Sequence, residues 1–390
     1  MTQLLRNRNA AVYLGAVLVS GFGSTAMILV AGVWVMSLTG SSSLAAAVGF
    51  LMYSPTLVAP LLGALVDRTP HRRAVLVGVN LAMGLILFGL LLVRSADQVW
   101  LIFVVMLLYG VSFVVLDAAE TAVLPAAVDR ELLGDVNGLR MSISEGVKLV
   151  APLVGAGLFT IAGGAGVAVL DAVTFLSAAA LCLMLRFHPR GYDRSVPQSA
   201  GGLRDYPALH RLVLCGAAVT FTSGVSGAML FAVIKDGLGY APAYAGVLSA
   251  VQGAGAIAGG LLAGPLQRRF RAQVFVGAAI AVFALSLGLR AVPATVPVLA
   301  SALLAGVSLP CVLIAIATTV QREVPTERLG RVAGAVNLFT FVPIAAGQAL
   351  GAVLLSTVDR RIVLAAVAVV AASAAAVCLR PVRATVPSGT

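Results

Sequence analysis

The stretch GALVDRTPHRR, residues 63–73, decides the fold. Apolar runs long enough to cross a bilayer flank it on both sides. Asp67, Arg68, Arg72 and Arg73 cannot lie in hydrocarbon, because each charge there would cost about 2.5–3.5 kcal/mol. The stretch is therefore expected to form a short loop at a membrane face, between two transmembrane helices.

The composition is that of a membrane protein. The chain of 390 residues is 60% hydrophobic and only 11% charged, whereas soluble domains have about 25% charged residues. Its length is sufficient for about twelve spans of about 20 residues. The net charge of +11 does not indicate a nucleic-acid partner, because the arginines interrupt apolar runs and so report membrane topology.

Twelve apolar runs predict an all-α polytopic protein with twelve transmembrane helices. They lie near residues 10–38, 44–66, 74–93, 99–121, 138–160, 166–186, 209–234, 242–264, 274–291, 297–320, 333–357 and 362–380. The connections are short except for one that is rich in Arg, Pro, Gly and Ser. It predicts an N-terminal six-helix bundle (1–186), a cytoplasmic linker (187–208) and a C-terminal six-helix bundle (209–390). The first run has no signal-peptide cleavage site and is expected to remain as the first helix.

The basic residues orient the chain. With both termini in the cytoplasm, only five of the 26 Lys and Arg fall outside, and one, Lys148, lies within a helix. The five are Arg94, Lys235, Arg290, Arg360 and Arg361. The other 20 lie in cytoplasmic segments. This bias predicts a multi-pass protein of the cell (inner or plasma) membrane, with both termini cytoplasmic.

Two internal similarities relate the halves of the chain. The segment ELLGDVNG at 131–138 returns as ERLGRVAG at 327–334. A second version of the 63–73 loop, GLLAGPLQRR at 260–269, keeps the glycine and the arginines but has no acidic residue. Such a parallel repeat predicts two pseudo-symmetric halves.

The 63–73 loop resembles the signature loop between helices 2 and 3 of the major facilitator superfamily, G-x-x-x-D-R-x-G-R-R. The positions that fit are Gly63, Asp67, Arg68 and Arg72. Pro70 and His71 depart from the motif, and Arg73 adds a cation. The resemblance implies the twelve-helix major facilitator fold and alternating access.

Three further segments are similar to the macrolide-efflux branch of drug–proton antiporters: 33–41, 169–181 and 230–248. This resemblance implies proton-coupled efflux of amphipathic small molecules, of the multidrug, antibiotic or siderophore-like kind. Two segments depart from that branch. Residues 103–110 lack its mid-helix arginine, and 151–156 keep only part of its Gly-Pro-x-x-Gly-Gly motif.

The loop is expected to act as a gate. Gly63 would let helices approach closely, and Asp67 would lie near the helix start at 331–334. Arg72 or Arg73 would approach acidic groups on helix 4 in an outward-facing state.

Ionisable residues within the spans are candidates for proton coupling. Asp117 and Glu120 share a face of helix 4; they either receive the loop arginines or accept protons. Glu145 and Lys148 on helix 5 form either a permanent ion pair or a cavity-lining pair in which Glu145 exchanges a proton. We rank Glu145 first because it lies deepest among these acids. Asp171 on helix 6 is interpreted as a packing residue rather than a coupling site.

The C-terminal half offers uncharged polar groups for a substrate cavity: Gln252, Asn337 and Gln348. Phe22 and Trp34 are the aromatic candidates for the same cavity. The four cysteines lie in apolar runs without CxxC spacing, so no metal site and no cofactor are expected. The expected partners are a small-molecule substrate, protons and the lipid bilayer, with no nucleic acid, and the protein is expected to be a monomer.

The residues themselves predict a polytopic transporter with two parallel halves. The resemblance implies that it is a secondary active transporter that exports amphipathic small molecules in exchange for protons. The alternatives are a metabolite importer or facilitator on the same fold, or a lipid flippase. No HExxH motif or Ser/Lys pair indicates an enzyme, and no GxxxxGK[ST] loop indicates an ATP-driven pump.

Overall fold

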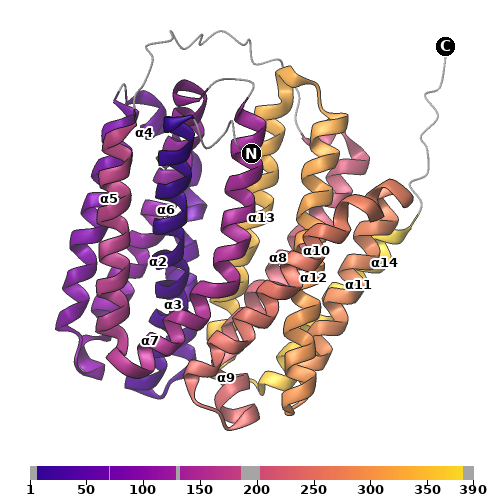
Figure 1. The fold of residues 1–390 in the computed structure, drawn as a ribbon. Coiled ribbons are helices and arrows are strands. Elements are labelled where there is room, and N and C mark those ends of the chain that lie inside the picture. The colour runs from indigo at the N-terminus through magenta and orange to yellow at the C-terminus, as the bar shows by residue number, and fades with distance from the viewer. Residues whose placement is uncertain (1–6, 70, 129–131, 186–202, 381–390) are drawn as a thin grey trace.

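A computed structural model describes residues 7–69, 71–128, 132–185 and 203–380. Some side chains within these ranges are not described, among them those of Asp67, Arg72, Glu145 and Arg331. The described residues form helices and no strand (Figure 1). They contain 11 segments that are long and apolar enough to cross a membrane. One of these is 39 residues long and holds two spans, so the predicted all-α fold of twelve spans is confirmed.

The N-terminal half contains the first six spans. Their elements are α2 (Arg8–Thr39), α3 (Ser42–Tyr53), η1 (Ser54–Val58), α4 (Ala59–Arg68), α5 (Arg72–Phe88), η2 (Gly89–Leu92), η3 (Ala96–Gln98), α6 (Val99–Ala127) and α7 (Leu133–Met184). The second span is α3, η1 and α4 in succession, with Pro55 and Pro60 at the junctions. Proline is tolerated there because it opens each new helical segment.

A single glycine divides α7 into the fifth and sixth spans. Gly163 has φ 64° and ψ −172°, outside the helical region. A side chain at this φ would be strained, so glycine is favoured there. The chain reverses at Gly163 without a separate loop, and helical residues continue on both sides of this turn. The hydropathy pattern therefore shows two apolar runs within one assigned helix.

The C-terminal half contains the other six spans. Its elements are η5 (Leu203–Asp205), α8 (Pro207–Ala228), α9 (Leu230–Ala232), η6 (Val233–Gly237), η7 (Pro242–Tyr244), α10 (Ala245–Arg269), α11 (Ala272–Arg290), α12 (Thr295–Glu323), α13 (Thr326–Leu354) and α14 (Arg360–Leu379). The predicted helices agree with these within a few residues. The linker boundaries at 187–208 stay a prediction, because residues 186–202 lie outside the described ranges.

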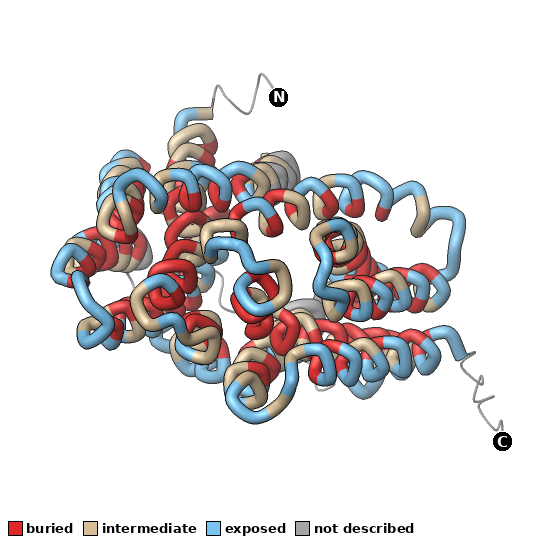
Figure 2. The backbone as a smooth tube through the Cα atoms, turned by 90° about the horizontal axis from the view of Figure 1, so that it is seen from below, coloured by how far each residue is buried: buried red, intermediate tan, exposed pale blue. Residues whose placement is uncertain are grey.

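The outer surface of the bundle is apolar. Figure 2 shows exposed residues along the outward faces of the helices and buried ones toward the interior. Large hydrophobic side chains are widely exposed, with Ile161 at 86%, Val296 at 76% and Leu261 at 74%. Such a surface requires lipid rather than water around it. The chain is therefore a multi-pass membrane protein.

The two halves pack against each other near one membrane face. We call the face at which α2 begins and α14 ends the termini face, and the other the opposite face (Figure 1). At the opposite face, Lys235 Nζ donates to the carbonyl oxygen of Gly40 at 2.9 Å. Phe231 packs against Gly32, where a Cβ would lie only 2.7 Å from its ring. These contacts close the opposite face.

Helix α10 meets α7 at two glycines. A Cβ on Gly246 would lie 2.5 Å from the Cβ of Ala156, and one on Gly253 would lie 3.0 Å from the Cα of Leu149. The backbones of the two halves can approach this closely because both positions lack a side chain.

We predict that Gly246→Val opens this contact, because the new methyl groups would overlap α7. Spin labels on Leu44→Cys and Ala241→Cys, exposed residues of the two halves at the opposite face, should show a longer distance by double electron–electron resonance. Gly260→Val on the same helix is the control, since no atom lies within 4 Å of a Cβ there. Equal distances in the two variants would contradict the prediction.

Candidate functional site

The stretch 63–73 contains the end of one helix and the start of the next at the termini face, so the connection is shorter than the predicted loop. Helix α4 ends at Arg68, and α5 begins at Arg72. Arg68 is exposed. No atom lies within 4 Å of a Cβ built on Gly63, so the close helix approach expected there is not made in this conformation. The predicted pairing of Asp67 with residues 331–334 lies outside the described side chains.

Arg73 contacts the end of the sixth span in this conformation, and its expected approach to the acids of helix 4 in an outward-facing state stays a prediction. Its Nη2 donates to the carbonyl oxygen of Leu183, in the last turn of α7. A cation at a helix C-terminus is favoured by the free carbonyl groups and the helix dipole. In this conformation, Arg73 therefore ties α5 to the end of the sixth span rather than to the acidic residues of α6.

Glu120 is held by groups from two other helices. The Tyr13 hydroxyl of α2 donates to Glu120 Oε2 at 2.9 Å, and Arg140 Nη1 of α7 lies 3.7 Å from the same oxygen. A cavity of about 30 Å³ borders Tyr13, Glu120 and Asn80. Asp117, one turn earlier on α6, is exposed. The cation beside Glu120 thus comes from the fifth span, not from the signature loop.

Asp171 is the most deeply buried acid of the described residues, with 0% exposure. Its Oδ2 accepts a hydrogen bond from the Tyr109 hydroxyl at 2.8 Å, and its Oδ1 accepts one from Thr174 Oγ1 at 3.1 Å. Gly23 of α2 makes room for the carboxyl group, because a Cβ there would lie 2.5 Å from Asp171 Oδ1. The cluster joins α2, α6 and α7, which is a packing role.

The Glu145–Lys148 pair stays a prediction. Both residues lie on α7, but the side chain of Glu145 is not described. Lys148 is exposed, and the backbone beside it meets Gly253 of the other half. The pair therefore lies where the two halves touch.

A polar cavity of about 190 Å³ lies within the C-terminal half and reaches Tyr53 of α3. It brings together Gln252 of α10 and Gln348 of α13, two of the three polar residues expected to bind substrate. The third, Asn337, is exposed and does not line this cavity.

The two aromatic candidates belong to the packed interior of the N-terminal half. Trp34 is only 6% exposed and packs against Gly164, where a Cβ would overlap its ring. Phe22 packs against the same hydrophobic core. In this conformation neither residue lines the polar cavity.

The sequence analysis did not place the charged side chain of this cavity, Arg290, among the binding candidates. Arg290, the last residue of α11, was counted with the basic residues on the outer side of the membrane. Its side chain instead lines the cavity, and its Nη1 donates to Ser226 Oγ of α8 at 2.9 Å. A long basic side chain at a helix end usually extends toward the interface. The sequence gives one hint of a polar site here, which is the pair Ser223 and Ser226, one helical turn apart. Both residues line the cavity.

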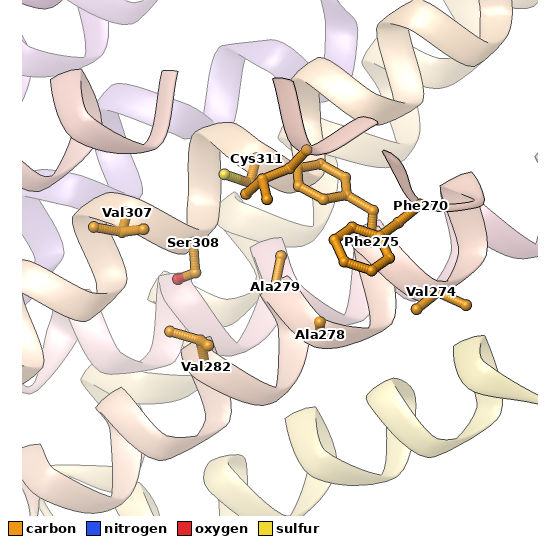
Figure 3. Close-up of a pocket in the computed structure, with 10 residues that line it drawn as sticks. Phe270, Val274, Phe275, Ala278, Ala279, Val282, Val307, Ser308 and Cys311 are labelled. Atoms are coloured by element: carbon orange, nitrogen blue, oxygen red, sulfur yellow. The ribbon is translucent and has the colours of Figure 1, made fainter. Parts of the chain in front are cut away.

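A second cavity, of about 270 Å³, lies among α10, α11 and α12 (Figure 3). Its lining is apolar except for Ser308 and Cys311, and both of these donate to backbone carbonyl groups. Phe270 at its edge is 51% exposed. This cavity has no charged group to orient a substrate, which suits a hydrocarbon chain of the surrounding lipid.

Within the described residues, no group of three His, Cys, Asp or Glu side chains could hold a metal ion. Cys182, Cys215, Cys311 and Cys378 are free and buried, which is typical of small hydrophobic residues in a core.

A sequence profile described as Major Facilitator Superfamily matches residues 12–211 and again 212–390. The chain belongs to the major facilitator superfamily. It is therefore a membrane transporter and not an enzyme. No curated protein matches the sequence. The macrolide-efflux branch stays a prediction.

Solved structures of several transporters share the fold over nearly the whole chain. A bacterial homologue of the human lysosomal transporter Spinster, inward-facing and unoccupied, is 17% identical, with TM-score 0.69 over 95% of this chain and 96% of its own. A bacterial homologue of the iron transporter ferroportin, also inward-facing, is 19% identical, with TM-score 0.71 over 96% and 98%. A mutant of the nucleoside transporter NupG is 15% identical, with TM-score 0.72 over 95% and 100%. Identities this low show the fold alone.

We predict that Tyr109→Phe lowers the free energy of unfolding by about 1–3 kcal/mol, because it removes a hydrogen bond from a buried carboxyl group. Unfolding in mixed detergent and dodecyl sulfate micelles measures the change. The control is Ser112→Ala, which removes only a bond from Ser112 to the Tyr109 carbonyl within one helix and should cost about 0.5 kcal/mol, the low end for a neutral hydrogen bond. Similar losses in both variants would show that the Asp171 cluster does not stabilise the fold.

Proposed function

We propose that this transporter exports amphipathic small molecules in exchange for protons, by alternating access. The observation that carries the proton coupling is the pair of carboxyl groups within the fourth span, those of Asp117 and Glu120. Ionisable groups at membrane depth are costly and mark ion pathways. The direction of transport rests on the likeness of the sequence to the macrolide-efflux branch.

The setting of Glu120 supports a proton-exchanging role for this residue. Its carboxyl group borders a small cavity and is bound by Tyr13 on one side and Arg140 on the other. A proton on Glu120 would weaken its attraction to Arg140 and free α7 from α6 at that point. Glu145, further along α7, stays the first-ranked acceptor from the sequence, and it lies near the contact between the halves at Leu149 and Gly253.

Closure at the opposite face supports a two-state mechanism. The Lys235–Gly40 and Gly246–Ala156 contacts hold the halves together at one end, and rocking of one half against the other would exchange that closure for one at the termini face. With both termini in the cytoplasm, as the basic residues indicate, this conformation faces inward.

Proteoliposomes test the proposal. Purified protein with an imposed pH gradient should move at least one member of a panel of fluorescent amphiphiles: cationic ethidium, anionic 8-anilinonaphthalene-1-sulfonate and neutral N-phenyl-1-naphthylamine. Glu120→Gln and Glu145→Gln should each lower gradient-driven flux by about tenfold or more, because the glutamine amide cannot take up the proton that would drive transport. Exchange of substrate across the membrane without a pH gradient should persist in a variant that still binds and moves substrate but no longer couples this movement to protons.

Asp205→Asn is the matched control, because Asp205 is an acid of the C-terminal half that pairs with Arg328 at 3.6 Å, outside the spans. If wild-type protein moves the panel at the same rate with and without the gradient, proton exchange is wrong. A facilitator or importer would then be the better assignment.

The gate is tested with Asp67→Asn. We predict loss of transport with normal membrane insertion, because the loop anion would no longer bind the start of α13. Uptake assays and membrane-fraction immunoblots measure the two properties. Glu323→Gln is the control, since Glu323 is an exposed acid at the end of α12, outside the 63–73 stretch. Wild-type transport by Asp67→Asn would remove the loop from the gating mechanism.

A further inference from the structure

We propose that the polar cavity of the C-terminal half binds the anionic group of the substrate, so that the transported class is organic anions with a small apolar body. The inference rests on the proposed transport function and names its substrate class. The residues that would hold the anion are Arg290, Ser226, Gln252 and Gln348.

No acidic side chain that the structure describes balances the charge of Arg290. Among the described residues, its guanidinium group bonds only to the hydroxyl of Ser226, which is 3% exposed. No described acidic side chain forms an ion pair with it or lines the cavity. A partly buried cation loses hydration free energy. Only an anion or several hydrogen bonds can offset that loss. A carboxylate, sulfonate or phosphate matches the fork of N–H donors that a guanidinium group presents.

The other polar groups supply further donors. Gln252 and Gln348 line the cavity from α10 and α13, and their side-chain amides make no hydrogen bond within the described part of the chain. Ser286, by contrast, already donates to the carbonyl oxygen of Phe283 at 2.6 Å. Two amide groups with free N–H donors beside one guanidinium group form a site for an acceptor-rich ligand.

The remaining wall limits the size and polarity of the ligand. Phe283, Leu287, Leu309 and Ile344 face the cavity, so part of the ligand must be apolar. The volume is about 190 Å³, and a cavity of about 150 Å³ holds benzene. The site therefore suits an acidic group on one or two rings, whereas the ammonium group of a cationic amphiphile would be repelled by Arg290.

The cavity reaches the junction between the halves. Tyr53 lines it from α3, and Gln348 lies against the same helix, because a Cβ on Gly49 would be 3.0 Å from Gln348 Oε1. A ligand bound to Arg290 would thus contact both halves. Such a position lets ligand binding change the equilibrium between the two closures.

The test is direct binding to the full chain, purified in a neutral detergent. Isothermal titration compares 1-naphthoate with 1-naphthamide and 1-naphthylmethylamine, which share the ring and differ in charge. We expect 1-naphthoate to bind at least about tenfold more tightly than either. Arg290→Gln should weaken 1-naphthoate binding roughly tenfold to a hundredfold, the range for a lost hydrogen-bonded charge. Arg290→Lys should fall in between, because it keeps the charge without the fork.

Arg271→Gln is the matched control, because Arg271 precedes the other end of the same helix and is exposed; its binding should equal that of wild type. Gln252→Ala gives a second variant in case Arg290→Gln does not fold, as judged by size-exclusion chromatography, and should weaken binding severalfold. Equal binding of the three naphthyl compounds, or undiminished 1-naphthoate binding in Arg290→Gln, would overturn the proposal.

Two other outcomes have distinct meanings. Binding of short-chain phosphatidylglycerol without binding of 1-naphthoate would overturn the proposal in favour of a lipid headgroup site. Binding of 1-naphthoate without gradient-driven transport would support this site and reject proton-coupled export, because the titration does not depend on transport.

Discussion

The structure depends on one constraint, which is that an ionisable side chain inside a bilayer needs a partner. The N-terminal half satisfies it within the protein: Asp171 accepts hydrogen bonds from Tyr109 and Thr174, and Glu120 is bound by Tyr13 and Arg140. The C-terminal half leaves it partly unmet, since Arg290 bonds to Ser226 alone among the described residues. A charge that no described side chain neutralises is available to a ligand.

In the mechanism that we propose, this contrast divides two tasks between the halves. Acids of the N-terminal half would exchange protons, while the cation and amides of the C-terminal half would hold an acidic substrate. Release of protons on one half and of an anion on the other can be coupled only through the contact between them. Tyr53 and Gly49 on α3, beside Gln348, provide that contact.

Closure of the opposite face depends on small residues rather than on ion pairs. Gly246 and Gly253 bring α10 against α7 at backbone distance, and the Lys235–Gly40 hydrogen bond lies at the exposed end of the contact. Packing of this kind is short-ranged, because it is lost once the helices separate. A membrane protein that must open and close benefits from contacts that break over a small displacement.

The sequence by itself determined the fold class, the twelve spans, the repeat and the superfamily, because hydropathy over about 20 residues and the order of charges in residues 63–73 are properties of the linear chain. It also identified Gln252 and Gln348, since uncharged polar residues are conspicuous within apolar runs. Only the tertiary structure decided that Arg73 binds the Leu183 carbonyl, that Trp34 lies in the core, and that Arg290 turns into a cavity. The direction of a long side chain at a helix end is set by the space that neighbouring helices leave, and no local pattern encodes that space.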